Sequence, residues 1–227
     1  MSVAKHPSRV PRWQRQPEIR PQQILEAAFR VFGTRGLHQA TLDDVARAAG
    51  ITKGTIYLYF PSKAALFSAM LKARVNDLLP PMGASDPRRA RSTHHQFLTL
   101  ARRLYRFFQS PAFLAMYRTM VGEAPQFPDA AALLYREGIL PANRRLAEVI
   151  RERIIAGEFR DVDPLVAARA FAGMFQVFAV SQGLLGGQRI FPIPDARIVR
   201  TVTEIFFHGM LASPGRAPRK RPVRGSR

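Results

Sequence analysis

Helical periodicity runs almost without interruption from about residue 20 to about residue 212, and signals for β-strands are nearly absent. Apolar residues recur every three or four positions, and residues that favour helix starts or ends stand between these runs. The pattern predicts an all-α fold of about nine helices. The first is expected to end at Gly33 and Gly36, because glycine readily adopts the left-handed conformation that closes helices. We expect the helices over residues 21–32, 41–49, 53–59, 62–79, 92–109, 111–122, 128–156, 163–185 and 194–212.

A stretch rich in proline and arginine divides the chain at residues 79–91. It holds three prolines, one glycine and three arginines, a composition typical of a linker. We therefore expect a small helical unit over residues 18–78 and a larger helical unit over residues 92–212. Residues 1–17 and 213–227, called the basic arms below, combine positive charge with proline and glycine, so they are predicted to be disordered.

Net charge restricts the partners of this chain. The formal charge is +19, and residues 1–21 and 216–227 contribute +10 of it through 11 basic residues and one acidic residue. Such a balance favours polyanions, among which nucleic acid comes first and an anionic membrane surface second. The alternative is that the basic arms only aid solubility.

Several classes of protein are disfavoured by what the sequence does not contain. The chain has no cysteine, which excludes a disulfide framework and a thiolate metal site. The N-terminal residues show no apolar run typical of a signal peptide. The longest apolar stretch, residues 170–187, contains Gln176, Ser181 and Gln182, so it is interpreted as a buried helix and no membrane span is expected.

Residues 41–60 have the organisation of a helix-turn-helix motif, in which two helices are joined by a tight glycine turn. Thr41 is a good N-cap, Gly50 ends the first helix, Thr52 caps a short second helix, and Pro61 stops it. The second helix of such a motif enters the major groove of DNA. Hydroxyl groups, lysine charges and a glycine that allows close approach suit this contact. The predicted DNA-contacting residues are Thr41, Thr52, Lys53, Gly54, Thr55, Tyr57, Tyr59 and Lys63.

Three patterns follow one another along residues 20–66. They are Ile-Leu-x-x-Ala-x-x-x-Phe over residues 24–32, Asp-Val-Ala over residues 44–46, and AGITKGTIYLYF over residues 49–60. With them, this segment resembles the three-helix DNA-binding domain of the TetR/AcrR family of bacterial transcriptional regulators. Residues 123–128 and 157–164 resemble an AefR-like C-terminal subclass of the same family. Leu58 departs from the residue type that many members carry, so base preference at that position is not carried over.

The resemblance implies an all-helical homodimer whose N-terminal domain binds a palindromic DNA operator, usually to repress. It also implies a C-terminal domain that holds a small-molecule cavity and a dimer interface built mostly from the last two helices. Binding of the effector would shift the spacing of the two recognition helices and release the DNA. A cytoplasmic, nucleoid-associated bacterial protein without a membrane partner is expected.

Aromatic and methionine side chains are dense in the C-terminal half and predict an apolar cavity for an apolar or aromatic effector. The alternative for each of these residues is an ordinary core position. The candidate pocket residues are Phe97, Phe108, Phe113, Met116, Tyr117, Met120, Tyr135, Met174, Phe175 and Phe178.

The last two predicted helices each carry an apolar stripe, which predicts a dimer interface, although the monomer's own core could use the same stripe. The candidate interface residues are Phe171, Phe178, Ile198, Val202, Ile205 and Phe206.

Other polar groups point to no catalytic or metal site. His94 and His95 are adjacent on a helix and therefore point apart, so no metal is expected. Arg102, Arg103 and Arg106 could receive an acidic group of a ligand or DNA, or form a solvated helix face. No phosphate loop or nucleophile elbow is present, so we predict neither an enzyme nor a cofactor. The alternative to a ligand-responsive regulator is an architectural protein that coats DNA without an effector.

Overall fold

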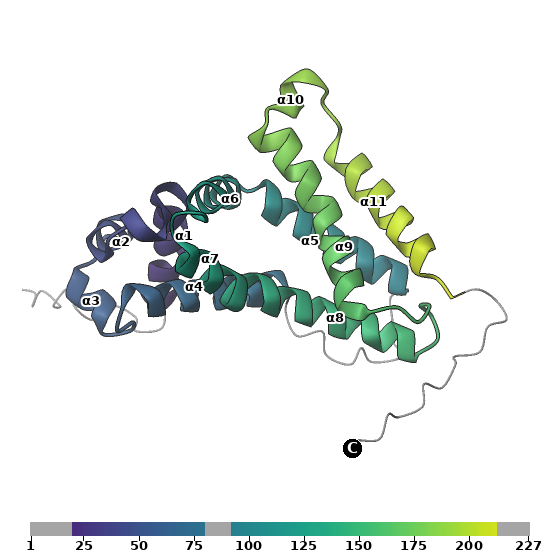
Figure 1. Cartoon of the computed structure of the whole chain (residues 1–227), viewed down its shortest axis with the longest axis horizontal. Coiled ribbons are helices and arrows are strands. Elements are labelled where there is room, and N and C mark those ends of the chain that lie inside the picture. Colours follow the sequence, from purple (N-terminus) through teal and green to yellow (C-terminus); the bar gives the residue numbers. More distant parts are fainter. Residues whose placement is uncertain (1–19, 80–91, 213–227) are drawn as a thin grey trace, which may run out of the picture.

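The computed structural model describes residues 20–79 and 92–212, and within these ranges it consists of helices joined by short loops, with one isolated antiparallel bridge between Phe159 and Leu211. The predicted all-α fold is confirmed (Figure 1). The predicted basic arms and nearly all of the predicted linker lie outside the described residues. The helices are α1 (Arg20–Gln39), α2 (Leu42–Ala49), α3 (Lys53–Tyr57), α4 (Lys63–Leu78), α5 (Thr93–Gln109), α6 (Pro111–Glu123), α7 (Pro128–Leu134), α8 (Leu140–Ile155), α9 (Pro164–Ala179), α10 (Gly187–Ile190) and α11 (Asp195–Met210).

Short-range capping interactions explain where most of these helices begin and end. The Thr41 hydroxyl accepts a hydrogen bond from the amide of Asp44 at 3.2 Å at the start of α2. Gly50 closes α2 with a φ of 67°, a conformation that glycine adopts without strain. Ser62 caps α4 in the same way as Thr41 caps α2, and the Asp163 carboxylate accepts two amide hydrogen bonds at the start of α9.

Helix α1 is longer than the sequence predicted, because Gly33 does not end it. Gly33 is buried against α6, and a Cβ atom there would lie 3.0 Å from the carbonyl oxygen of Ala112. The glycine therefore allows α6 to approach the backbone of α1. Gly36, with a φ of 74°, bends the chain, and a final turn runs on to Gln39.

The two longest predicted helices contain π-helical turns. The turn η2 (Tyr135–Ile139) joins α7 to α8, and it precedes Pro141, which lacks the N–H of a regular helix. A second turn, η3 (Val180–Leu184), extends α9. The short helix α10 was not predicted; it follows Gly186, which has a φ of 78°.

The helices form one continuous hydrophobic core rather than two separate ones. Helix α1 packs against α2, α4 and α6, while α9 packs against α5, α8 and α11. The hydroxyl of Thr119 on α6 donates to the carbonyl of Gly33 on α1 at 3.0 Å, and the rings of His38 and Phe127 stack at 4.0 Å. Figure 1 shows α2 and α3 at one end of the long axis, with α9, α10 and α11 toward the other end.

Candidate nucleic-acid interface

The short helix α3 follows α2 after a tight turn and is anchored by its apolar side. Ile56 is fully buried, and Val45 of α2 is also fully buried in the same core. The backbone N–H of Ile51 donates to the carbonyl of Ala46 at 3.0 Å, which fixes the turn between the two helices. Helices α2 and α3 therefore have the arrangement predicted for a helix-turn-helix motif.

The other side of α3 carries large side chains that the fold leaves in solvent. Tyr57 is 50% exposed, Tyr59 is 37% exposed, and Leu58 is 80% exposed. Burying such side chains within the chain would stabilise it, so their exposure at the end of α3 and in the turn after it marks a surface suited to a partner.

Two threonine hydroxyls meet at the N-terminus of α3. The Thr52 hydroxyl accepts a hydrogen bond from the amide of Thr55 at 3.3 Å, and the two hydroxyl oxygens are 3.0 Å apart. Gly54 lies between them in sequence, and a Cβ atom there would meet only the Thr52 hydroxyl, at 3.8 Å. The N-terminal turn thus offers hydroxyl groups on an open surface, as predicted for the residues that enter a groove first.

Lys53 lies beside an acidic residue of α2. Its Nζ atom is 2.8 Å from Oδ2 of Asp43, and this hydrogen bond, together with the charge of Asp43, raises the pKa of Lys53. Both side chains are exposed, so the ion pair is weak and open to exchange with another anion. Lys53 is thus positively charged and reaches the same surface as the hydroxyls of α3.

Thr41 has a structural role that uses both of its donors. Its amide and its hydroxyl donate to Oδ2 of Asp44, at 3.1 Å and 2.8 Å. These hydrogen bonds, and the nearby guanidinium groups of Arg35 and Arg47, hold the pKa of Asp44 below its ordinary value. A phosphate contact by Thr41 stays a prediction, and it would require the hydroxyl to leave Asp44.

Lys63 also has partners within the chain. Its Nζ atom donates to the carbonyl oxygens of His38 and Ala40, both at 2.9 Å, and thereby ties the start of α4 to the end of α1. Two of its three N–H groups are used, which leaves one for a phosphate. The sequence pattern did not indicate this role because the partners are 25 and 23 residues away.

The predicted effector-pocket residues do not meet in one place. Phe97 and Phe175 belong to the closed core between α5, α9 and α11, where Phe97 lies 5.6 Å from Phe171 and 5.9 Å from Phe206 between ring centroids. Tyr135 is 40% exposed and accepts a hydrogen bond from Arg169. The others divide between two places. Phe108, Phe113, Met116, Met120 and the half-buried Tyr117 lie on α5 and α6 near α1, whereas Met174 and Phe178 line a groove on α9.

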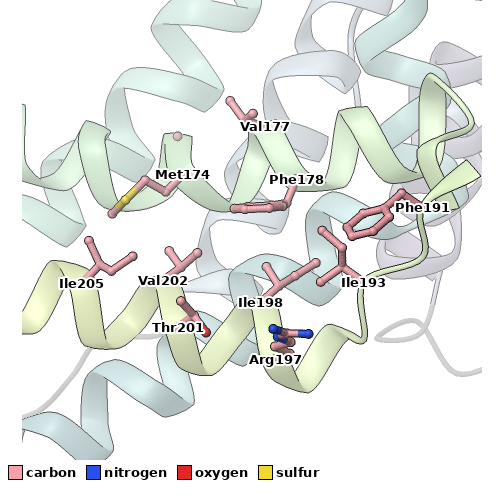
Figure 2. A pocket seen from close by; sticks show the side chains of 11 residues that line it. Met174, Val177, Phe178, Phe191, Ile193, Arg197, Ile198, Thr201, Val202 and Ile205 are labelled. Carbon is pink, nitrogen blue, oxygen red and sulfur yellow. The ribbon is translucent and has the colours of Figure 1, made fainter.

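That groove runs between α9 and α11 and has a volume of about 560 Å³ (Figure 2). Figure 2 shows Met174 and Phe178 of α9 facing Ile198, Val202 and Ile205 of α11, while Val177 lies on the opposite edge of α9 in this view. Val177 is 67% exposed and Ile205 is 63% exposed, so the groove opens to solvent.

Four of the candidate interface residues are buried in the core: Phe171 is fully buried, and Ile198, Val202 and Phe206 are only 3%, 4% and 7% exposed. The ring centroids of Phe171 and Phe206 are 4.6 Å apart. Phe178 is half-buried and Ile205 is 63% exposed, so among the six candidates these two leave surface open at the groove.

Helix α9 and the π-helical turn after it form an unusually long apolar segment. Pro164–Leu184 is long and apolar enough to cross a membrane by composition alone, and 28% of its most apolar window is buried inside the chain. Its buried side packs against three other helices, as expected for a core helix. Its open side, which includes Val166 at 64% exposed, needs a cover.

Among the described residues, no group of three or more potential metal ligands comes together. Nε2 of His94 lies 2.9 Å from Oε1 of Glu204, an acidic neighbour on α11 that the sequence spacing did not reveal.

Family comparisons match almost all of the described chain. The description "Bacterial regulatory proteins, tetR family" matches residues 24–70, and "AefR-like transcriptional repressor, C-terminal domain" matches residues 95–209. The HTH-type transcriptional regulator SrpR of Pseudomonas putida is 39% identical over 66 residues, which are 27% of this chain and 31% of that regulator. The chain thus matches less than two thirds of the length of the first curated relatives.

Two other proteins are similar over most of their length. The uncharacterized HTH-type transcriptional regulator YdgC of Bacillus subtilis is 26% identical over 194 residues, which cover 83% of this chain and 91% of that protein. A crystal structure of a TetR family transcriptional regulator from Pseudomonas syringae pv. tomato superposes with a TM-score of 0.56 at 23% identity, covering 86% of this chain and 99% of the other. This second likeness concerns the fold.

Proposed function

Because this chain belongs to the TetR family of bacterial regulatory proteins and is a DNA-binding regulator of transcription, we propose that it acts as a ligand-responsive homodimeric repressor. In this proposal the dimer binds a palindromic operator in the cytoplasm, at the nucleoid, and a small apolar effector releases it. Members of the family bind DNA operators and small molecules and work as dimers.

The exposed face of α3 is the observation that carries the proposal. Tyr57 at the end of α3 and Tyr59 just after it project hydroxyl-bearing rings into solvent, while the buried Ile56 before them holds the helix to the core. Stiff side chains lose little conformational entropy when they bind, and their hydroxyls suit phosphate oxygens. Thr52 and Thr55 precede them at the end of the helix that enters the major groove first.

A binding-site selection tests this assignment. Tyr57→Phe removes one phosphate-directed hydroxyl, so it should weaken binding by about 1 kcal/mol, or about fivefold, on every sequence alike. Thr55→Ala should change the selected bases instead. The cap of α3 survives this change because the Thr55 amide, which stays, is the group that donates to Thr52.

The outcome of the selection also separates the two proposed functions. A regulator protects one short palindrome and does not protect a scrambled duplex. An architectural protein that binds through its basic arms would show equal affinity for both. Identical preferences for wild type, Tyr57→Phe and Thr55→Ala would contradict the contact geometry proposed for α3.

The open groove between α9 and α11 supports a homodimer. Val177 and Ile205 place apolar side chains in solvent along two adjacent helices, and a second copy of the same surface would cover them. A twofold dimer would present two copies of α3 to half-sites about 34–36 Å apart, or a multiple of that spacing. The operator is therefore expected to be a palindrome.

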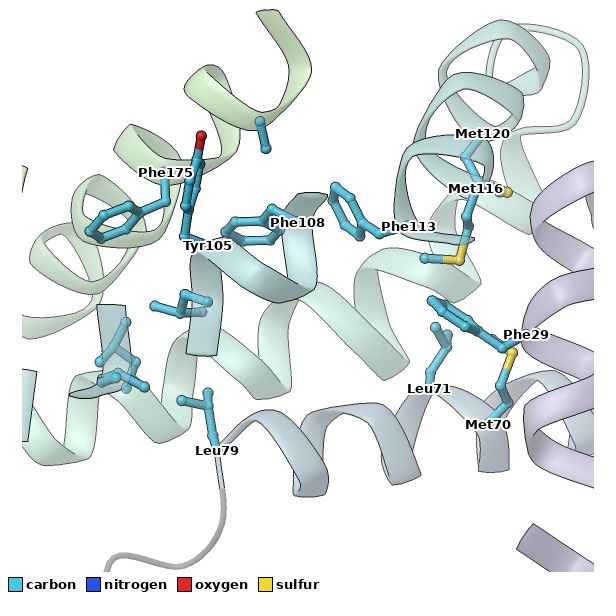
Figure 3. Packing of buried hydrophobic residues seen from close by; sticks show 14 of the residues in the cluster. Phe29, Met70, Leu71, Leu79, Tyr105, Phe108, Phe113, Met116, Met120 and Phe175 are labelled. Carbon is cyan, nitrogen blue, oxygen red and sulfur yellow. The ribbon is translucent and has the colours of Figure 1, made fainter. Parts of the chain in front are cut away.

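The effector is proposed to contact the apolar residues of α5 and α6. Phe108, Phe113, Met116 and Met120 form a buried group there that lies against α1, and methionine side chains adapt readily to different shapes. Figure 3 shows Phe108, Phe113 and Phe29 in a row between α5, α6 and α1. A ligand at this position would touch α1, which packs against α2 of the helix-turn-helix motif.

A further inference from the structure

A second pocket, of about 650 Å³, lies where α1 and α4 meet α5 and α6. We call it the junction pocket. Its lining combines an apolar floor with three arginines: it is formed by Phe29, Arg74, Asp77, Leu78, Arg103, Arg106, Phe107, Ser110 and Ala112. The junction pocket is open to solvent, with Arg103 and Arg106 exposed at its edge, and its volume is within the range of sites that hold small molecules.

The positive charge of the junction pocket is only partly balanced. Asp77 is its one acidic lining residue, and its carboxylate lies 3.6 Å from the guanidinium of Arg74, one turn away on α4. Arg74 also lies over the ring of Phe29, with its Cζ atom 4.6 Å from the ring centroid. Within the described ranges, Arg103 and Arg106 have no ion-pair partner. They are three residues apart on α5, so their side chains reach the same side of that helix.

The floor of the junction pocket leads to the buried aromatic group of α5 and α6. The ring of Phe107 lies 6.4 Å from Phe29 and 5.0 Å from Phe113 between centroids, and Phe113 lies 5.0 Å from Phe108. A molecule with one charged end could thus place its anion between the arginines and its apolar part against Phe107. The pocket thus offers both positive charge and an apolar surface, which are the two properties that an amphipathic anion requires.

From this arrangement we propose that the junction pocket binds a small amphipathic anion, with a carboxylate or phosphate group held by Arg103 and Arg106 and an apolar body on Phe29 and Phe107. Arginine suits both anions because its planar guanidinium donates two parallel hydrogen bonds. The inference rests on the proposed ligand-responsive function and refines it: the effector is mainly apolar but carries one anionic group, and its apolar body lies on Phe107, next to Phe113 of the buried group of α5 and α6.

The junction pocket is well placed to act on the DNA-binding helices and is distinct from the DNA surface. Arg74 is 11 residues beyond Lys63 on α4, or about 16 Å along the helix axis from the end that follows α3. An anion held by Arg103 and Arg106 of α5 would lie beside Arg74 and Asp77 at the C-terminal end of α4, which line the same pocket. Occupancy of the pocket would therefore favour one position of α4 relative to α5.

Calorimetric titration of the full chain tests the inference, with dodecanoate and dodecyl phosphate as probes below their micelle-forming concentrations. Dodecanol and inorganic phosphate serve as controls for the tail alone and the anion alone. We expect one of the two amphipathic anions to bind, and the one that binds more tightly identifies the preferred head group. The double variant Arg103→Gln/Arg106→Gln should bind it at least about tenfold more weakly, since two charge-assisted hydrogen bonds are lost.

Arg102→Gln is the matched control, because Arg102 is exposed on the same helix but does not line the pocket. It should bind the anion within about twofold of wild type. Equal binding by the double variant, equal binding of dodecanol by wild type, or binding of neither anion would overturn the inference.

Operator affinity measured without any ligand separates this inference from the proposed function. If all variants bind the operator and none binds an anion, only the junction-pocket assignment fails. If wild type binds no DNA specifically, the proposed function fails whatever the titration shows. A loss of operator affinity confined to the double variant would assign these arginines to DNA, which also overturns the inference.

Discussion

Two adjacent residues of α11 should respond in opposite ways to the same substitution. Ile205 is 63% exposed beside the open groove, whereas Phe206 is 7% exposed and its ring lies 4.6 Å from that of Phe171. Ile205→Glu should leave the monomer helical and break the dimer. Phe206→Glu should unfold the chain, because it places a carboxylate in the core.

The expected loss of dimerisation free energy for Ile205→Glu follows from the exposure of the Ile205 side chain. Full burial of an isoleucine side chain contributes about 1.5–3 kcal/mol, so covering the exposed 63% contributes about 1.5 kcal/mol in each protomer. Twofold symmetry doubles this to about 3 kcal/mol, which corresponds to about a hundredfold in the dimer dissociation constant. Burying two carboxylates would add to the loss, so a hundredfold is a lower bound.

The expected free-energy cost of Phe206→Glu is larger, and it lowers the stability of the folded monomer rather than that of the dimer. Removing a buried phenylalanine side chain alone costs about 3–5 kcal/mol, and burying an unpaired carboxylate costs several more. The sum approaches the total stability of a typical domain, about 5–15 kcal/mol. Circular dichroism should therefore show loss of helix for Phe206→Glu and retained helix for Ile205→Glu.

Sedimentation equilibrium over a range of concentrations measures the dissociation constant. Ala196→Glu is the control for charge, because Ala196 is exposed and lies nine residues, or two and a half turns, before Ile205 on the other side of α11. It should dimerise like wild type. An unchanged dissociation constant for Ile205→Glu, or a folded Phe206→Glu, would refute the division of α11 into a core side and an interface side.

Three further substitutions or truncations test other parts of the structure. Gly36→Ala should destabilise the chain by about 1–2 kcal/mol in urea unfolding, because Gly36 has a φ of 74° and a Cβ atom would lie 2.3 Å from a carboxylate; Gly122→Ala, which meets nothing within 4 Å, is the control. Tyr105→Phe should stabilise the chain by about 1 kcal/mol, because the buried hydroxyl of Tyr105 makes no hydrogen bond of good geometry among the described residues, although the side chain of Gln109 is close enough to lower its pKa slightly. Burial raises the pKa of Tyr105 to about 12, so wild type should lose on the order of 2 kcal/mol relative to Tyr105→Phe as the pH rises from about 10 to about 12. Removal of both basic arms takes away ten of the 35 basic residues and should flatten the salt dependence of DNA binding; an unchanged slope would mean that the arms do not contact DNA.

The sequence was sufficient for features that depend on neighbours along the chain. Thr41, Gly50 and Asp163 were recognised as caps because each acts on a backbone group within four residues, and such interactions do not depend on the rest of the fold. The helix-turn-helix unit was predicted for the same reason, since its caps, its turn and its inward Ile56 form a short continuous pattern.

Features that depend on distant partners could not be derived in this way. The phosphate contact of Lys63 stays a prediction, but the sequence did not indicate that its ammonium group also donates to carbonyls at the end of α1, more than twenty residues earlier. Gly33 was predicted to end a helix, but α6 packs against it and the helix continues. Of three neighbouring arginines on α5, only the packing against α1 and α4 brings Arg103 and Arg106, and not Arg102, into the junction pocket.

The apolar stripes of α9 and α11 show most clearly the difference between what local sequence determines and what distant packing determines. Periodicity alone determined that both segments are helices with apolar sides, because that signal depends only on the spacing of residues along the chain. Which apolar residue enters the core and which remains open to a second copy depends on where α5 and α8 lie. Only the tertiary structure therefore separates Phe206 from Ile205, although hydrophobic burial stabilises a core and an interface by the same physical effect.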